Sequence, residues 1–151
     1  MLTNKIKIFG VAVDDSHHFK EEFRPTRMNP GRGWIEVFAK NLSSSSILKS
    51  LRNGDFYFST GVKFKSIAYD INEIKIKIFG DNYDEGILKN KFINDSKYTT
   101  QLISNNGEII DEIHGKNVAF NLKKINKNLT YLRTKTTSTT GCFGWTQPCF
   151  I

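Results

Sequence analysis

"FYFSTGVKFKSIAYDINEIKIKIFG", residues 56–80, is the stretch that decides the fold. Apolar residues alternate there with lysine, serine and other polar residues, a pattern typical of β-strands that bury one face. Gly61, Asp70 and Asn72 interrupt the alternation, and these residue types are common in turns. The stretch therefore predicts three consecutive strands joined by short turns.

Short β-type runs continue from this stretch to the C-terminus. They lie at residues 97–104, 108–115, 117–124, 129–137 and 144–151. The Asn-Gly pair in "SNNGEI", residues 104–109, is a strong signal for a two-residue hairpin turn. Seven or eight short strands separated by such turns predict an antiparallel β-sandwich-like domain over residues 55–151.

Residues 1–54 have a different character from the strand-rich remainder. "NKIKIFGVAV", residues 4–13, first alternates lysine with isoleucine and then becomes continuously apolar. This change predicts a strand that passes from a half-exposed position into a buried sheet. A loop rich in proline and glycine follows, and "WIEVFA" at 34–39 predicts the next strand.

The sequence predicts one helix, over residues 44–53. Ser43 or Ser44 can cap its N-terminus, and Gly54 supplies a left-handed stop at its C-terminus. The apolar face of this helix is short, so we expect it to pack on a sheet. Together with the strands it gives an α+β fold class that is mainly β.

Length and composition exclude several classes of protein. With 151 residues the chain fits one ordinary domain, or a small domain with an extra segment. The net charge is +7, but the lysines are scattered, so we expect no nucleic-acid binding. No apolar run is long enough for a membrane helix and no signal peptide is evident, so we expect a cytoplasmic protein in which Cys142 and Cys149 are free thiols.

The predicted strand at 4–13 ends in a cluster of metal-ligand side chains. Asp15 and His17 lie two positions apart, and a carboxylate and an imidazole suit zinc, manganese or iron. Asp14 or His18 could then hydrogen-bond to one of these ligands and fix its orientation. Two ligands are fewer than a catalytic metal needs, and the alternative is a turn capped by the aspartates with two exposed histidines. His114 lies in a hairpin region and is not predicted to be a ligand.

Three segments of the chain resemble the C-terminal part of PHP-domain proteins, the polymerase and histidinol phosphatase superfamily of metal-dependent phosphoesterases. They are "VAVDDSHHF" at 11–19, "PGRGWIEVFAKNLSSSSILKSLRNGDFYFSTGVKFKSI" at 30–67 and "GWTQPCF" at 144–150. The resemblance implies a distorted (βα)7 barrel with up to three metal ions. The last metal motif of the family, Asp-x-His, falls on Asp15, Ser16 and His17, whereas the His-x-His motif and the intermediate ligands have no counterpart here.

The resemblance therefore implies a division of the chain at residue 54. Residues 1–54 would be the end of a PHP barrel with its connecting helix, and residues 55–151 an appended β domain. We expect no catalytic residue and no phosphoesterase activity in the isolated chain, since hydrolysis of a phosphate ester would need the rest of the barrel from a separate N-terminal chain. The alternative is a non-catalytic β-sandwich module that binds a ligand or serves as a structural part.

Two further expectations concern partners and phosphate contacts. The apolar faces of 4–13 and 34–39 need a cover, which the β domain, a second copy of the chain in a homo-oligomer or the separate N-terminal chain could supply, so we expect oligomerisation more than for an average domain of this size. Arg24, Arg27 and Arg32 follow the Asp15–His17 pair closely, where guanidinium groups could contact phosphate. Ordinary surface arginines are the alternative.

Overall fold

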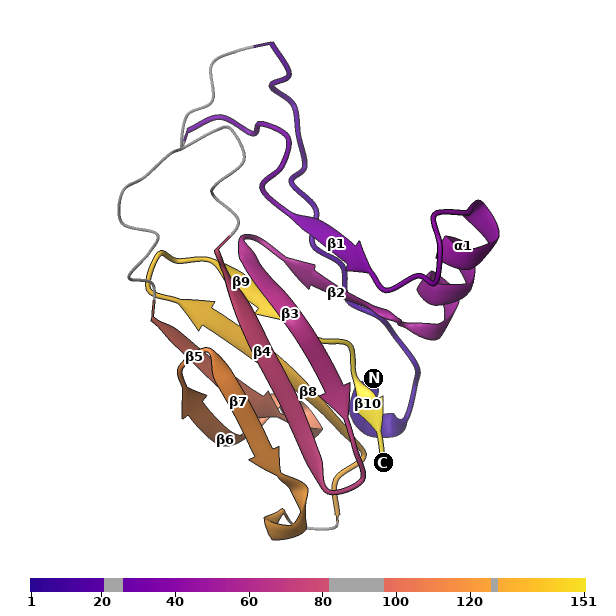
Figure 1. Ribbon diagram of the computed structural model, residues 1–151, viewed down its shortest axis with the longest axis vertical. Coiled ribbons are helices and arrows are strands. Elements are labelled where there is room, and N and C mark those ends of the chain that lie inside the picture. The colour runs from indigo at the N-terminus through magenta and orange to yellow at the C-terminus, as the bar shows by residue number, and fades with distance from the viewer. Residues whose placement is uncertain (21–25, 82–96, 126–127) are drawn as a thin grey trace.

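The computed structural model describes residues 1–20, 26–81, 97–125 and 128–151 and is mainly β, with antiparallel sheets and one α-helix in this part of the chain (Figure 1). The helix is α1 (Ser44–Asn53), and short 3-10 turns lie at Leu2–Asn4, Asn105–Gly107 and Leu122–Lys124. The strands are β1 (Trp34–Val37), β2 (Phe56–Ser59), β3 (Val62–Tyr69), β4 (Glu73–Asp81), β5 (Tyr98–Ile103), β6 (Ile109–His114), β7 (Asn117–Asn121), β8 (Tyr131–Ser138), β9 (Phe143–Trp145) and β10 (Cys149–Phe150). The fold class predicted from the sequence, α+β and mainly β, is confirmed at this level.

The strands form two antiparallel sheets. The larger has the order β1-β2-β9-β8-β5-β6, with β10 paired to β8, and the smaller has the order β3-β4-β7. β3 and β4 form the hairpin that residues 56–80 predicted, with Tyr69 opposite Ile74 next to the turn. The described residues form no closed barrel.

One apolar cluster draws its side chains from both sheets. β4 illustrates how the sequence builds it, because Ile74, Ile76 and Ile78 are at most 5% exposed while the lysines between them are exposed. Burying each such isoleucine stabilises the fold by about 1.5–3 kcal/mol. The fully buried members of the cluster are Tyr57 from β2, Val62 from β3, Ile76 from β4, Leu102 from β5 and Phe120 from β7.

The predicted hairpin turn joins β5 and β6. Asn106 and Gly107 both have positive φ, 57° and 81°, as an Asn-Gly turn requires. Ile103 pairs with Ile109 across it, and the N–H of Ser104 donates to the carbonyl of Glu108 at 2.9 Å.

The helix begins and ends where the sequence predicted. The Ser43 hydroxyl accepts a hydrogen bond from the N–H of Ser46 at 3.3 Å, which identifies Ser43 as the cap. Gly54 has φ 84° and closes the C-terminus by donating to Leu51 and Ser50. The Ser50 hydroxyl donates to the carbonyl of Phe38 at 2.8 Å and so attaches the helix to the end of β1. No helix in the described ranges is long and apolar enough to cross a membrane.

The strand predicted at 4–13 is wrong. After the 3-10 turn, Lys5 takes a left-handed conformation and the chain runs past β1 and β2 without pairing to either (Figure 1). The side-chain amide of Gln147 bonds both the N–H and the carbonyl of Gly10, at 2.9 and 2.8 Å. A single side chain therefore takes the place of a neighbouring strand at this point.

The same segment is also far less buried than predicted. Ile6, Ile8, Val11 and Val13 are 42–75% exposed, and we call these four the apolar strip. Gly10 lies so close to the Phe58 ring that an added Cβ would come within 2.4 Å of it. The segment thus contacts the sheet through Gly10 and through Phe9, whose ring lies 5.9 Å from the ring of Phe56, and it leaves the apolar strip at the surface.

The predicted division at residue 54 stays a prediction. β1 and β2 lie on opposite sides of that position and pair antiparallel, with Trp34 opposite Ser59 and Val37 opposite Phe56. Cys142 is buried and Cys149 half-buried, and neither is in a disulfide, as predicted.

Candidate functional site

The Asp15–His17 region is a loop held by one carbonyl oxygen. The N–H groups of His17 and His18 both donate to the carbonyl of Met28, at 2.9 and 3.0 Å. The Ser16 hydroxyl donates to the same oxygen at 3.1 Å. Three donors on one acceptor fix the backbone of residues 16–18 against the returning chain.

Asp14 and His18 tie the two sides of this loop together. The Asp14 carboxylate accepts from the N–H of Gly31 at 2.6 Å, and His18 Nδ1 accepts from the N–H of Met28 at 3.1 Å. The carbonyl of His18 accepts from the amide of Asn29, which is fully buried. Both residues predicted to orient a metal ligand therefore have structural hydrogen bonds inside the loop; the alternative, a turn capped by the aspartates, expected such a role for Asp14, but it expected His18 to be merely exposed, whereas His18 is half-buried.

The side chains of Asp15 and His17 are exposed, whereas those of Asp14, Ser16 and His18 between and beside them are half-buried. Asp15 has φ 47°, in the left-handed region that non-glycine residues seldom adopt. Among the described residues, neither the Asp15 nor the His17 side chain has a hydrogen bond or an ion pair with the protein. No cluster of three or more His, Cys, Asp or Glu side chains able to hold a metal occurs in this part of the chain. The backbone at the pair is thus fixed, none of the described residues joins Asp15 and His17 as a third ligand, and metal binding stays a prediction.

The predicted phosphate-binding arginines are placed only in part. Arg24 falls outside the described residues. Arg27 is exposed and Arg32 half-buried, and both lie on the loop that returns from the Asp15–His17 region toward β1.

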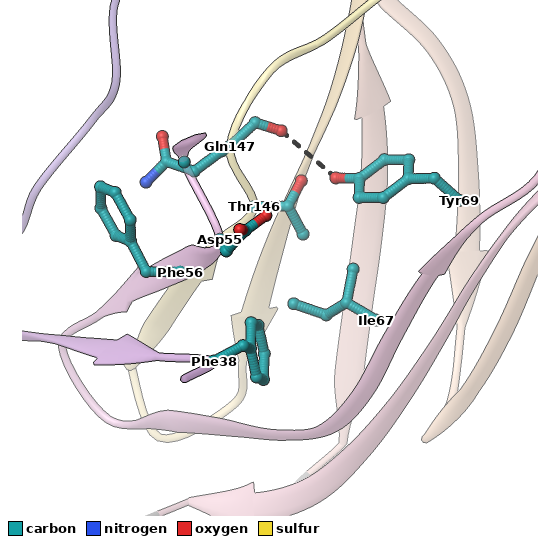
Figure 2. Close-up of a pocket in the computed structure, with 8 residues that line it drawn as sticks. Phe38, Asp55, Phe56, Ile67, Tyr69, Thr146 and Gln147 are labelled. Carbon is teal, nitrogen blue, oxygen red and sulfur yellow. Dashed lines mark hydrogen bonds between the residues drawn. The ribbon is translucent and has the colours of Figure 1, made fainter. Parts of the chain in front are cut away.

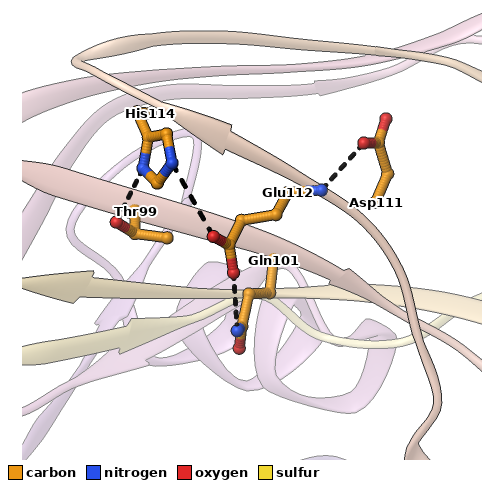
Figure 3. Close-up of polar contacts among 5 residues, drawn as sticks. All are labelled: Thr99, Gln101, Asp111, Glu112 and His114. Atoms are coloured by element: carbon orange, nitrogen blue, oxygen red, sulfur yellow. Dashed lines mark hydrogen bonds and ion pairs between the residues drawn. The ribbon is translucent and has the colours of Figure 1, made fainter.

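His114 belongs to a surface network on β5 and β6, far along the chain from the loop (Figure 3). Its Nδ1 lies 2.9 Å from the Thr99 hydroxyl, and its Nε2 lies 3.8 Å from the Glu112 carboxylate. The Gln101 amide donates to the other oxygen of Glu112 at 2.9 Å. These residues are opposed or adjacent across the hairpin, so the contacts are those expected between cross-strand pairs.

A pocket of about 320 Å³ lies beside the C-terminal end of the helix (Figure 2). Its walls come from four separate parts of the chain: the end of β1, the helix stop, β3 and the connection from β9 to β10. The lining residues are Phe38, Gly54, Asp55, Phe56, Ile67, Tyr69, Thr146 and Gln147. Sequence reasoning did not find this pocket, because no local pattern connects these positions.

Two hydroxyl groups line the pocket, those of Tyr69 and Thr146. The Tyr69 hydroxyl donates to the carbonyl of Gln147 at 3.2 Å (Figure 2), and the Thr146 hydroxyl oxygen accepts from the N–H and the hydroxyl of Thr134, at 2.9 and 3.3 Å. Burial raises the pKa of the Tyr69 phenol above its ordinary value, and the hydrogen bond from Thr146 opposes the shift. Tyr69 therefore remains a neutral donor through the physiological range.

The remaining groups of the pocket are one carboxylate and several aromatic rings. Asp55 is exposed, and its Oδ2 accepts from the Asn53 amide at 3.3 Å. Phe38 is 48% and Tyr69 40% exposed, although both lie beside buried strands. The pocket thus combines a negative charge with accessible aromatic surface.

Comparison of the chain with models of known protein families, with curated proteins and with solved structures gives no match.

Proposed function

We propose that the chain is the C-terminal part of a PHP-type metal-dependent phosphoesterase that supplies Asp15 and His17 as metal ligands and is inactive alone. The observation that carries the proposal is the loop itself. Three hydrogen bonds to the Met28 carbonyl fix its backbone, while Asp15 and His17 stay exposed. A loop ordered in this way can present two ligands to a metal without reorganising.

Zinc, manganese and iron all suit a carboxylate and a neutral imidazole. Bound there, the ion would polarise a phosphate ester and lower the pKa of a bound water. Asp15 and His17 would hold the ion, Asp14 and His18 would keep the loop in shape, and Arg27 or Arg32 would contact the phosphate. The further ligands and the barrel would come from another chain, so the isolated protein should not hydrolyse p-nitrophenyl phosphate.

Calorimetric titration with zinc chloride tests the ligand pair. We expect the parent to bind one zinc ion weakly, and Asp15→Asn and His17→Ala each to weaken binding by about tenfold or more. His114→Ala is the matched control, because His114 is also exposed but lies in the β5–β6 network. Zinc affinity that is equal in the parent and in both loop variants would refute the proposal.

A non-catalytic β-sandwich module is the second candidate. Two observations favour it: both sheets contribute to one apolar cluster, and within the described ranges Asp15 and His17 lack a third ligand. As such a module the chain would act through a partner or through its pocket. Zinc binding that is unchanged by the loop variants would favour this candidate over the first.

The apolar strip supports completion by a second polypeptide, either a barrel chain or another copy of this chain. Ile6, Ile8, Val11 and Val13 expose apolar side chains that a partner would cover. Light scattering on a size-exclusion column, repeated over a dilution series, separates a homo-oligomer from a monomer that awaits a different chain. We place the protein in the cytoplasm, since Cys142 and Cys149 are both thiols.

A further inference from the structure

The pocket beside the helix offers ligands hydrogen-bond acceptors and few donors. The Tyr69 hydroxyl already donates to the carbonyl of Gln147. The Gln147 amide is used on both sides by Gly10. A ligand that must accept hydrogen bonds therefore finds the Tyr69 hydroxyl and the Gln147 amide of the pocket already engaged.

Asp55 is the strongest acceptor that remains. A carboxylate has about four lone-pair sites, and Asn53 occupies one of them with a long bond of 3.3 Å. Asp55 also carries the only charged side chain among the residues that line this pocket. Its natural complement is a group that is both cationic and a pure donor, such as an ammonium, an amidinium or a guanidinium.

The aromatic rings suit the same kind of ligand. Phe38 and Tyr69 line the pocket together with Asp55, and both are partly accessible (Figure 2). The face of an aromatic ring attracts a cation and also packs against a flat apolar body. Ile67 and Phe56 extend this apolar lining.

The size of the pocket limits the ligand. A volume of about 320 Å³ is at the lower end of the range for small-molecule sites, so it fits a group of amino-acid side-chain size. Gly54 cannot be enlarged, since an added Cβ would come within 2.3 Å of the Phe9 ring, and this fixes the helix stop that carries Asp55.

We propose that this pocket binds a small organic cation through Asp55, with Phe38 and Tyr69 in contact with its apolar body. The site is distinct from the Asp15–His17 loop and shares no residue with it. The inference goes beyond the proposed phosphoesterase ancestry and stands or falls separately from it.

The probe for this site is benzamidine, with benzamide as its neutral counterpart of nearly the same shape. Titration of ¹⁵N-labelled protein, followed by two-dimensional NMR, reports both the affinity and the residues affected. We expect benzamidine to shift the amide signals of Gly54, Asp55 and Gln147, and benzamide to bind at least about tenfold more weakly because it lacks the charge.

Asp55→Asn removes the charge and keeps the shape of the side chain. We expect it to weaken benzamidine binding by about tenfold, while Asp111→Asn, which removes an exposed charge on β6, leaves the affinity unchanged. Equal affinity for benzamidine and benzamide would overturn the proposal, as would signal shifts confined to other surfaces. The comparison of the two probes uses the parent protein, so it remains decisive if the Asp55 variant does not fold.

Discussion

Replacing Gln147 by alanine should detach the N-terminal segment from the sheet. The Gln147 side chain is 7% exposed and bonds the N–H and the carbonyl of Gly10, which lies 137 positions away in the sequence. Two neutral hydrogen bonds contribute about 1–3 kcal/mol together, and we take about 2 kcal/mol as the expected loss. With a urea dependence of about 2 kcal/mol per molar, the unfolding midpoint should fall by about 1 M.

Hydrogen exchange distinguishes local detachment from global destabilisation. A global loss of about 2 kcal/mol should speed exchange of the Gly10 and the β4 amides alike by about thirtyfold, whereas purely local opening would speed Gly10 alone and leave the urea midpoint unchanged. Gln101→Ala is the matched control, since the Gln101 amide makes one exposed hydrogen bond, to Glu112. Its expected cost is below about 0.5 kcal/mol. Equal stability and equal Gly10 exchange in the two variants would refute the role assigned to Gln147.

Three further predictions concern Gly33, Tyr69 and the apolar strip. Gly33→Ala should cost about 1–3 kcal/mol in thermal unfolding, because its Cβ would come within 2.8 Å of the Val13 carbonyl oxygen, whereas Gly80→Ala, with nothing within 4 Å, should be neutral. Folding raises the pKa of Tyr69, so its neutral phenol contributes fully to the free energy of unfolding below pH 10 and less above it. The free energy of unfolding in urea should therefore fall less between pH 9 and 11 in Tyr69→Phe than in the parent. Val11→Lys combined with Val13→Lys should abolish any self-association seen by light scattering, and an oligomer that persists in this variant would exclude the apolar strip as its interface.

The strands and the helix were predictable because their signals are local. The alternation of Ile74, Ile76 and Ile78 with lysines can be recognised within nine residues, and the sequence marks the start of the helix with Ser43 and its end with Gly54. Both kinds of pattern lie within one short segment of sequence and require no contact with a distant part of the chain.

The segment 4–13 was mispredicted because alternation does not reveal whether a neighbouring strand is present. Its hydrogen-bond partner at Gly10 is the side chain of Gln147, and no local pattern identifies such a distant contact. The pocket escaped prediction for the same reason, because Phe38, Asp55 and Tyr69 meet only after the sheet has formed. For the Asp15–His17 pair the sequence indicated candidate ligands, and the structure supplied the hydrogen bonds that order their loop.

Selective perturbation of one histidine by zinc tests the central proposal most directly. The chain has three histidines, and their ring signals can be followed by NMR as zinc chloride is added. His18 Nδ1 accepts from the N–H of Met28 and His114 is hydrogen-bonded to Thr99, so both serve as internal controls. We expect the signals of His17 to move first and to saturate near one equivalent, and this response to disappear in Asp15→Asn. Signals of all three histidines that move together, or a His17 signal that moves equally without Asp15, would contradict a metal site at this loop.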